Sequence, residues 1–291
     1  FLFVAIGFIL GRTKIVKAEN SSMLSNLLVY VFLPCCNIKA FANNFTVQYI
    51  SQNYNYILFG MILLIIFIFI TKLCAKPLSR NKYDRYVYEY SMLVPNYGYM
   101  GYALAISCFG EMGLLNFIMF STPFTIYIYA MAFPFLTKHG FTLKGFLNAS
   151  MISIIIGIII GLSGIKLGGV VETVVVNGGN CMAPISMILT GLVVSEFKIK
   201  EIVKKWQIYP VTLMRLVILP LITGAVLTML PIDKSLVGIA ILFMALPCGL
   251  NTVIFPKLVG EDCSIGAGLA VISTVGACLT IPVVFAIFGL M

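Results

Sequence analysis

Long apolar runs divide this sequence of 291 residues, and they constrain its fold more than any other feature. A membrane-spanning helix needs about 20 apolar residues in succession, and the runs lack the period-two alternation of barrel strands. Only 10% of the residues are charged, whereas a soluble domain carries about 25%. Because a backbone in hydrocarbon must satisfy its own hydrogen bonds, the runs predict an all-α polytopic membrane protein without a separate soluble domain.

Ten membrane-spanning helices are expected, separated by short polar or charged segments. Their ranges are Phe1 to Leu10, Ser22 to Phe41, Tyr54 to Cys74, Tyr86 to Phe109, Gly113 to Leu136, Gly145 to Leu162, Val170 to Val194, Trp206 to Leu230, Leu236 to Val259, and Ser264 to Leu290. Ten residues are too few to cross a bilayer, so residues 1–10 are expected to end a span that begins earlier. The remnant of a cleaved signal is the alternative.

The basic residues predict the orientation of the chain. Counted on alternate sides of the membrane, fifteen of the 19 gather on one side, namely Arg12, Lys14, Lys17, Lys72, Lys76, Arg80, Lys82, Arg85, Lys138, Lys144, Lys198, Lys200, Lys204, Lys205 and Lys257. The other side has Lys166 and Lys234, while Lys39 and Arg215 lie within spans. By the positive-inside rule, we expect a cell-membrane protein with both termini on the non-cytoplasmic side. The net charge of +9 therefore reflects orientation and does not predict nucleic-acid binding.

Prolines within the spans recur at matched positions in the two halves of the chain. Pro34 and Pro95 lie 150 and 152 residues before Pro184 and Pro247. A five-span unit that is repeated once enters the membrane in the opposite direction the second time, because five is odd. We therefore expect two inverted five-helix repeats, residues 1–144 and 145–291, as in many secondary transporters. Pro34 and Pro184 are expected to kink spans 2 and 7.

Spans 4 and 9 carry the residues best suited to bind a ligand. Each span combines a helix-breaking proline, glycine and an amide side chain near the middle of the membrane. These residues are Pro95, Asn96, Gly98 and Gly101 in span 4, and Pro247, Gly249, Asn251 and Thr252 in span 9. Broken helices point N-termini, each equivalent to about half a positive charge, into a cavity, which favours a carboxylate near Asn96, Asn251 and Thr252. Ordinary helix packing by proline, glycine and asparagine is the alternative.

Arg215 lies near the middle of span 8, where a buried charge needs compensation. It is either a counter-charge for an anionic substrate or a cation that pairs internally, snorkels or hydrogen-bonds helix carbonyls. Lys39 is expected to snorkel, and Glu89 to pair with Arg85. No enzymatic, cofactor or metal site is expected, because the cysteines are scattered and the only histidine, His139, stands alone in a turn.

These motifs resemble the auxin efflux carrier family, which includes bacterial malate and malonate permeases. The resembling segments are Leu33-Pro34, Asn96 to Gly101, Pro184 to Gly191, and Pro247 to Asn251 followed by Leu258 to Asp262. Relatives typically carry a proline two residues after the second glycine of the span 4 run, where this chain has Ala103. That difference leaves the break point of span 4 open, with Pro95 as a substitute.

The resemblance implies a scaffold of spans 1, 2, 6 and 7 and a mobile transport unit of spans 3 to 5 and 8 to 10. Spans 4 and 9 would cross at their broken centres and bind the substrate there. We therefore expect a secondary transporter of small organic anions, such as malate, malonate or auxin-like acids, that works by alternating access. The alternatives are a sodium-coupled organic-anion symporter of the bile-acid type and a non-transporting membrane sensor. A proton or sodium as coupling ion, and a homodimer, are left open.

Overall fold

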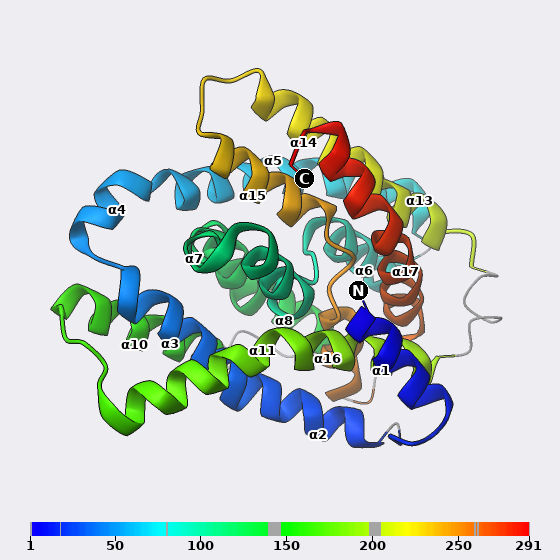
Figure 1. The fold of residues 1–291 in the computed structure, drawn as a ribbon. Coiled ribbons are helices and arrows are strands. Elements are labelled where there is room, and N and C mark those ends of the chain that lie inside the picture. The colour runs from blue at the N-terminus through cyan, green and yellow to red at the C-terminus, as the bar shows by residue number, and fades with distance from the viewer. Residues whose placement is uncertain are drawn as a thin grey trace. The chain divides into compact units, whose positions relative to one another are not determined.

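The structure, a computed structural model, describes residues 2–17, 19–79, 81–138, 147–197, 205–258, 260 and 262–290. The elements named within these ranges are helices (Figure 1). The α-helices are α1 Leu2–Arg12, α2 Glu19–Leu27, α3 Leu33–Asn44, α4 Val47–Asn53, α5 Asn55–Ala75, α6 Lys82–Leu93, α7 Tyr102–Tyr127, α8 Phe133–Thr137, α10 Ala149–Ser163, α11 Gly169–Glu196, α13 Ile208–Leu213, α14 Leu219–Thr228, α15 Lys234–Ala245, α16 Asn251–Leu258 and α17 Ser264–Ile287. The features that lie outside the described residues are His139, the expected boundary at residues 144 and 145, and the basic residues Arg80, Lys144, Lys198, Lys200 and Lys204.

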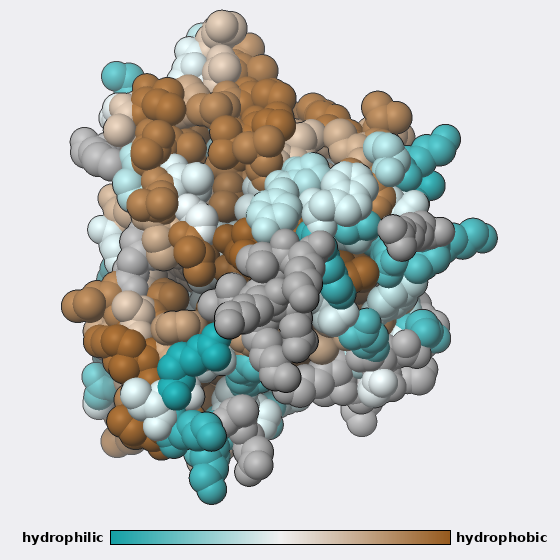
Figure 2. Space-filling view, turned by 90° about the vertical axis from the view of Figure 1, so that its right-hand side faces the viewer, coloured by the Kyte–Doolittle hydropathy of each residue, from teal (hydrophilic) through white to brown (hydrophobic). Residues whose placement is uncertain are grey.

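Within the part of the chain that the structure describes, six helical segments are long and apolar enough to cross a membrane, namely Asn20–Asn44, Asn55–Leu78, Tyr97–Thr137, Gly169–Glu196, Ile208–Thr228 and Ser264–Ile287. Shorter apolar helices are α1, α10 and α15. Many large apolar side chains are exposed, as expected for surfaces that contact lipid (Figure 2). The chain is thus an all-α multi-pass membrane protein with about six long apolar spans, and the ten-span inverted repeat stays a prediction.

The 41-residue segment Tyr97–Thr137 is not one straight helix. Gly110, inside α7, has φ 69° and ψ −167°, which no α-helix accommodates. A residue with a side chain rarely adopts such a positive φ, so glycine allows the chain to change direction here. The sequence predicts the connection between spans 4 and 5 at the same place.

Three prolines in the apolar helices follow a π-helical turn by two residues. The turns η1 Leu28–Phe32, η4 Ile128–Ala132 and η5 Met214–Ile218 precede Pro34, Pro134 and Pro220. Proline lacks an N–H and clashes with the preceding turn, and the wider turn relieves both problems without ending the helix. Pro34 thus follows a π turn, whereas Pro184 lies inside α11.

The helices form two compact units that interleave along the chain. Unit 1 comprises residues 1–57, 98–119 and 143–196, and unit 2 comprises residues 58–97, 120–142 and 197–291. In unit 1, α1 lies directly against α11. The two backbones are so close that a Cβ at Gly7 would clash with the Ile188 carbonyl oxygen, and a Cβ at Gly191 with the Val4 carbonyl oxygen. Small residues that allow close backbone contact are typical of helix packing in membranes.

Polar side chains join further helices of unit 1. The buried Asn37 of α3 donates from Nδ2 to the Ser153 hydroxyl of α10 at 2.9 Å. Lys39, expected to snorkel, instead places Nζ 2.7 Å from Glu111 Oε1 and 3.0 Å from Asn180 Oδ1. Its side chain is only 13% exposed. An ion pair and an amide thus compensate the charge of Lys39. The position of Lys39 within its expected span did not indicate these partners.

Unit 2 is packed around α15, in which every residue from Leu236 to Ala245 is buried. Phe243 of α15 lies against Phe120, Phe124 and Tyr97, with ring centroids 4.4 to 5.6 Å apart. Such aromatic contacts add to the stabilisation from burial.

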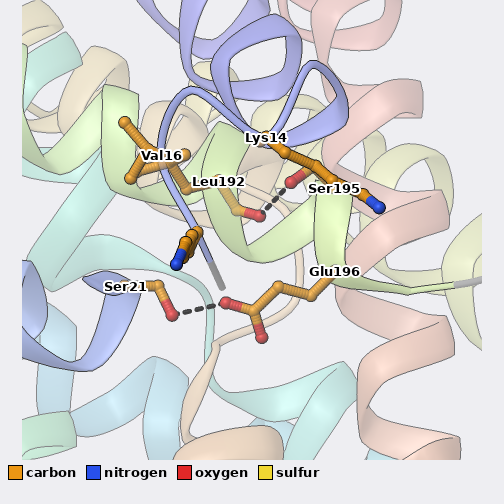
Figure 3. Close-up of a pocket in the computed structure, with 8 residues that line it drawn as sticks. Lys14, Val16, Ser21, Leu192, Ser195 and Glu196 are labelled. Carbon is orange, nitrogen blue, oxygen red and sulfur yellow. Dashed lines mark hydrogen bonds between the residues drawn. The ribbon is translucent and has the colours of Figure 1, made fainter. Parts of the chain in front are cut away.

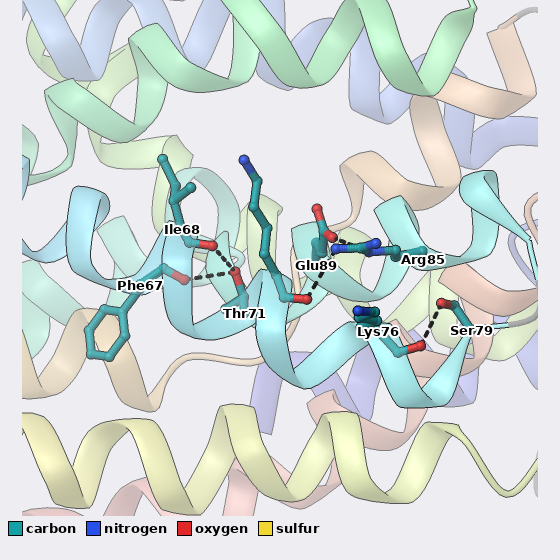
Figure 4. A network of polar contacts seen from close by, with 8 residues as sticks. Phe67, Ile68, Thr71, Lys76, Ser79, Arg85 and Glu89 are labelled. Atoms are coloured by element: carbon teal, nitrogen blue, oxygen red, sulfur yellow. Dashed lines mark hydrogen bonds and ion pairs between the residues drawn. The ribbon is translucent and has the colours of Figure 1, made fainter.

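Arg85, whose side chain is 38% exposed, connects α5 to α6 (Figure 4). Its Nε atom lies 2.8 Å from Glu89 Oε1, which confirms the predicted pair. Its Nη2 atom donates to the Lys72 carbonyl at 3.4 Å. Figure 4 also shows Thr71 donating to the Phe67 carbonyl, at 2.7 Å, so a hydroxyl inside an apolar helix is satisfied locally.

Candidate functional site

Two helices of unit 2 end abruptly at prolines. Helix α6 ends at Leu93 and helical structure resumes at Tyr97, while α15 ends at Ala245 and α16 begins at Asn251. The gaps contain Pro95 and Asn96 in the first case, and Pro247 and Gly249 in the second. Gly98 and Gly101 lie beyond the first gap, in the π-helical turn η3 Tyr97–Gly101. Proline without an N–H is well suited to such a gap, because it leaves no donor unpaired.

The two gap segments pair with each other like a short piece of antiparallel sheet. The Asn96 N–H donates to the Pro247 carbonyl at 2.8 Å, and the Gly249 N–H donates to the Val94 carbonyl at 3.1 Å. A Cβ on Gly249 would lie only 3.1 Å from that same oxygen, so glycine permits the close approach. The Cys248 N–H donates to the Ser273 hydroxyl at 3.0 Å. Non-helical backbone is tolerated at membrane depth only when its polar groups are satisfied in this way.

Arg215 binds the carbonyls at the ends of both interrupted helices. Its Nε atom donates to Leu246 O at 3.0 Å, and Nη2 donates to Phe243 O at 2.7 Å. Its Nη1 atom donates to Met92 O at 2.9 Å and to Leu93 O at 3.4 Å. The residue is 0% exposed. The sequence allows Arg215 to be a counter-charge for a substrate or a cation that is satisfied within the protein. These contacts show the second, hydrogen bonding to helix carbonyls.

The helix ends on the two sides of each gap carry partial charges of opposite sign. The C-terminal ends of α6 and α15 are the negative ends of their dipoles, and one guanidinium covers both. The positive N-terminal ends of the following helices begin at Tyr97 and Asn251. Among the described residues, no carboxylate forms an ion pair with Arg215. The region therefore carries an excess of positive charge, which favours an anion.

The two asparagines at the gaps differ in how their side chains are satisfied. Asn96 is 2% exposed, and neither its Nδ2 nor its Oδ1 has a hydrogen-bond partner among the described residues. Asn251 donates from Nδ2 to the Tyr90 hydroxyl at 2.8 Å. Thr252 is buried and donates its hydroxyl to the Gly249 carbonyl at 3.1 Å. Of these three residues, Asn96 retains an unused donor and an unused acceptor among the described residues, and such a buried, unsatisfied amide needs an explanation.

Three residues of this region were missed by reasoning from the sequence. The Tyr90 hydroxyl accepts a hydrogen bond from Asn251, and the Ser273 hydroxyl accepts one from the Cys248 N–H in the second gap. Gly266 of α17 lies against Thr252. The only local signal was a small or polar residue within an apolar run, and such a signal does not identify a partner.

Gly266→Ala is expected to destabilise the start of α16. A Cβ at Gly266 would clash with the backbone of Thr252, and overpacking of this kind costs about 1–3 kcal/mol. The matched control is Gly276→Ala on the same helix, where the Cβ meets only the movable end of the Leu216 side chain. Thermal unfolding of the purified protein should show the larger loss for Gly266→Ala. Equal melting temperatures for the two variants would contradict the assigned contact.

A cavity of about 310 Å³ lies beside Thr252 and is lined also by Asp84, Lys138 and Asp262. The pKa of Asp262 is held below its usual value, first by the Ser264 N–H, then by the Ser264 hydroxyl. Two carboxylates and one ammonium make this cavity a poorer environment for an anion than the helix gaps. Within the described ranges, no three His, Cys, Asp or Glu side chains are grouped so that they could hold a metal ion.

The sequence matches a known protein family. The family described as "Membrane transport protein" matches residues 1–140 and 133–285, and the two ranges together cover nearly the whole chain. No curated protein matches the sequence.

Proposed function

Because the chain belongs to the membrane transport protein family, the auxin efflux carrier family, we propose that it is a secondary transporter of small organic anions. That family contains transporters and not enzymes, so the substrate crosses the bilayer unchanged. The observation that carries the choice of an anion is the buried Asn96 amide, which has no hydrogen-bond partner among the described residues, in the region where Arg215 pairs with carbonyls and with no described carboxylate.

A carboxylate complements this region in charge and can use the unsatisfied donor of the Asn96 amide. Its oxygens accept from the Nδ2 atom of Asn96, and its charge is stabilised by the helix N-termini at Tyr97 and Asn251. Asn251 and Thr252 would complete the site, and Arg215 would act through its electric field and by fixing the gap segments. The donors of Arg215 are already engaged with carbonyls, so a direct contact with the substrate is not part of the proposal.

The two compact units support a mechanism of alternating access. Unit 1 includes the expected spans 1, 2, 6 and 7, and unit 2 includes the expected spans 3, 8, 9 and 10. Residues 98–119 group with unit 1, whereas the resemblance assigns them to the transport unit. We propose that one unit remains fixed in the bilayer while the helix gaps of the other carry the anion. Both termini would lie on the non-cytoplasmic side.

Uptake into proteoliposomes tests this function. The purified full chain should accumulate at least one labelled acid from a panel of dicarboxylates, monocarboxylates and aromatic acids, relative to empty liposomes. Imposed sodium and proton gradients identify the coupling ion, and strict dependence on sodium would favour a symporter. No flux of any anion under any gradient would contradict transport and favour a membrane sensor.

A further inference from the structure

A second cavity lies in unit 1, far in sequence from the helix gaps (Figure 3). Its volume is about 360 Å³, within the usual range of about 300–1,000 Å³ for ligand sites. The segment that follows α1 forms one wall, with Lys14, Val16 and Lys17, and the last turn of α11 forms another. The charge count predicts that this end of the helices faces the cytoplasm.

Two ammonium groups line this cavity. Among the described residues, neither Lys14 nor Lys17 has an ion-pair partner. Lys14 has φ 60°, a left-handed conformation that residues other than glycine rarely adopt. Glu196, the carboxylate in the wall, accepts a hydrogen bond from the Ser21 hydroxyl (Figure 3). The cavity is therefore lined by two ammonium groups and one carboxylate, of which Oε1 accepts from Ser21, so positive charge is in excess.

Exposed apolar side chains near the two lysines in sequence indicate the kind of ligand. Ile15, between the lysines in sequence, is 73% exposed, and Ile9 on α1 is 56% exposed. Met23, two residues after the cavity residue Ser21, is 65% exposed. Ammonium groups next to exposed aliphatic side chains at the end of an apolar helix are typical of the boundary between lipid headgroups and acyl chains.

We propose that this cavity binds the phosphate of an anionic phospholipid. Lys14 and Lys17 hold the phosphate oxygens, and the acyl chains lie along Ile15 and Ile9. Basic pockets between helices on the cytoplasmic side of membranes recognise lipid headgroups in this way. The apolar neighbours favour a lipid over free phosphate, because a soluble phosphate has no hydrocarbon to place on them.

Binding of phosphatidylglycerol to the purified full chain, measured by native mass spectrometry, tests this proposal. Lys14→Gln with Lys17→Gln is expected to weaken binding about 30-fold, and Lys17→Gln alone about fivefold, if each lysine contributes as basic residues near anionic membranes do. Lys14→Arg with Lys17→Arg should retain binding. The matched control is Lys166→Gln with Lys234→Gln, which removes equal charge from exposed positions on the opposite expected side and should bind as the wild type does.

Phosphatidylcholine and soluble glycerol phosphate distinguish the source of the phosphate. The proposal expects phosphatidylglycerol to bind more tightly than phosphatidylcholine, and glycerol phosphate not to displace it at equal concentration. The single variant Lys17→Gln decides the outcome if the double variant does not fold. Wild-type affinity in the glutamine variants, equal loss in the control, or displacement by glycerol phosphate would overturn the lipid site.

Discussion

Arg215→Lys is expected to lower both the stability of the protein and its uptake activity, although the positive charge is kept. The planar guanidinium reaches four carbonyls with three nitrogen atoms, whereas an ammonium is a compact point charge with three donors. Each lost hydrogen bond to a charged group costs about 1.5–3 kcal/mol, so we expect a loss of about 2–3 kcal/mol. Arg215→Met should cost more, about 3–5 kcal/mol, since it also leaves two helix ends uncompensated.

Thermal unfolding and proteoliposome uptake of the same preparations measure the two effects of Arg215. Arg85→Lys is the matched control, because the Arg85 side chain is partly exposed and forms an i,i+4 pair that contributes little. This control should unfold and transport nearly as the wild type does. If Arg215→Lys also behaves as the wild type, Arg215 acts only as a point charge and does not clamp the helix ends.

Asn96→Ala is expected to reduce uptake about 100-fold, the effect of losing hydrogen bonds to a charged carboxylate. The same change should leave the melting temperature unchanged or higher, because the Asn96 side chain makes no hydrogen bond among the described residues. Removing a buried, unsatisfied amide relieves a cost of folding. Uptake and thermal unfolding, measured on equal amounts of monodisperse protein, check both expectations.

The matched control for Asn96→Ala is Asn37→Ala. Asn37 is equally buried, but its Nδ2 atom donates to Ser153 between two helices of unit 1. We expect Asn37→Ala to lose about 1 kcal/mol of stability while uptake per folded molecule is retained. If Asn96→Ala unfolds readily while Asn37→Ala loses transport, the assignment of binding and structural roles is reversed.

Local chemistry was sufficient to predict the long helices and where two of them end. The run Tyr54 to Cys74 corresponds to α5 Asn55–Ala75, because an uncharged run of that length has few alternatives in a membrane. Helices stop near Pro95 and Pro247 because the missing N–H is a property of the residue itself. The identity of the ligand at these gaps is still a prediction.

Long-range partners could not be predicted from the sequence. The depth of Arg215 showed that its charge needs compensation, but the carbonyls that provide it come from helices more than 25 residues away in the chain. The same holds for Lys39 with Glu111 and for Asn251 with Tyr90. Such contacts depend on how helices pack, and local composition does not determine that packing.

Equilibrium binding of the transported carboxylate to purified protein tests the central claim most directly. The labelled acid that proteoliposomes take up would be titrated against wild type, Asn96→Ala and Asn37→Ala, all shown to be monodisperse. We predict saturable binding by the wild type and by Asn37→Ala, and affinity about 100-fold weaker for Asn96→Ala. Equal affinity of Asn96→Ala and the wild type would contradict a carboxylate site at the helix gaps.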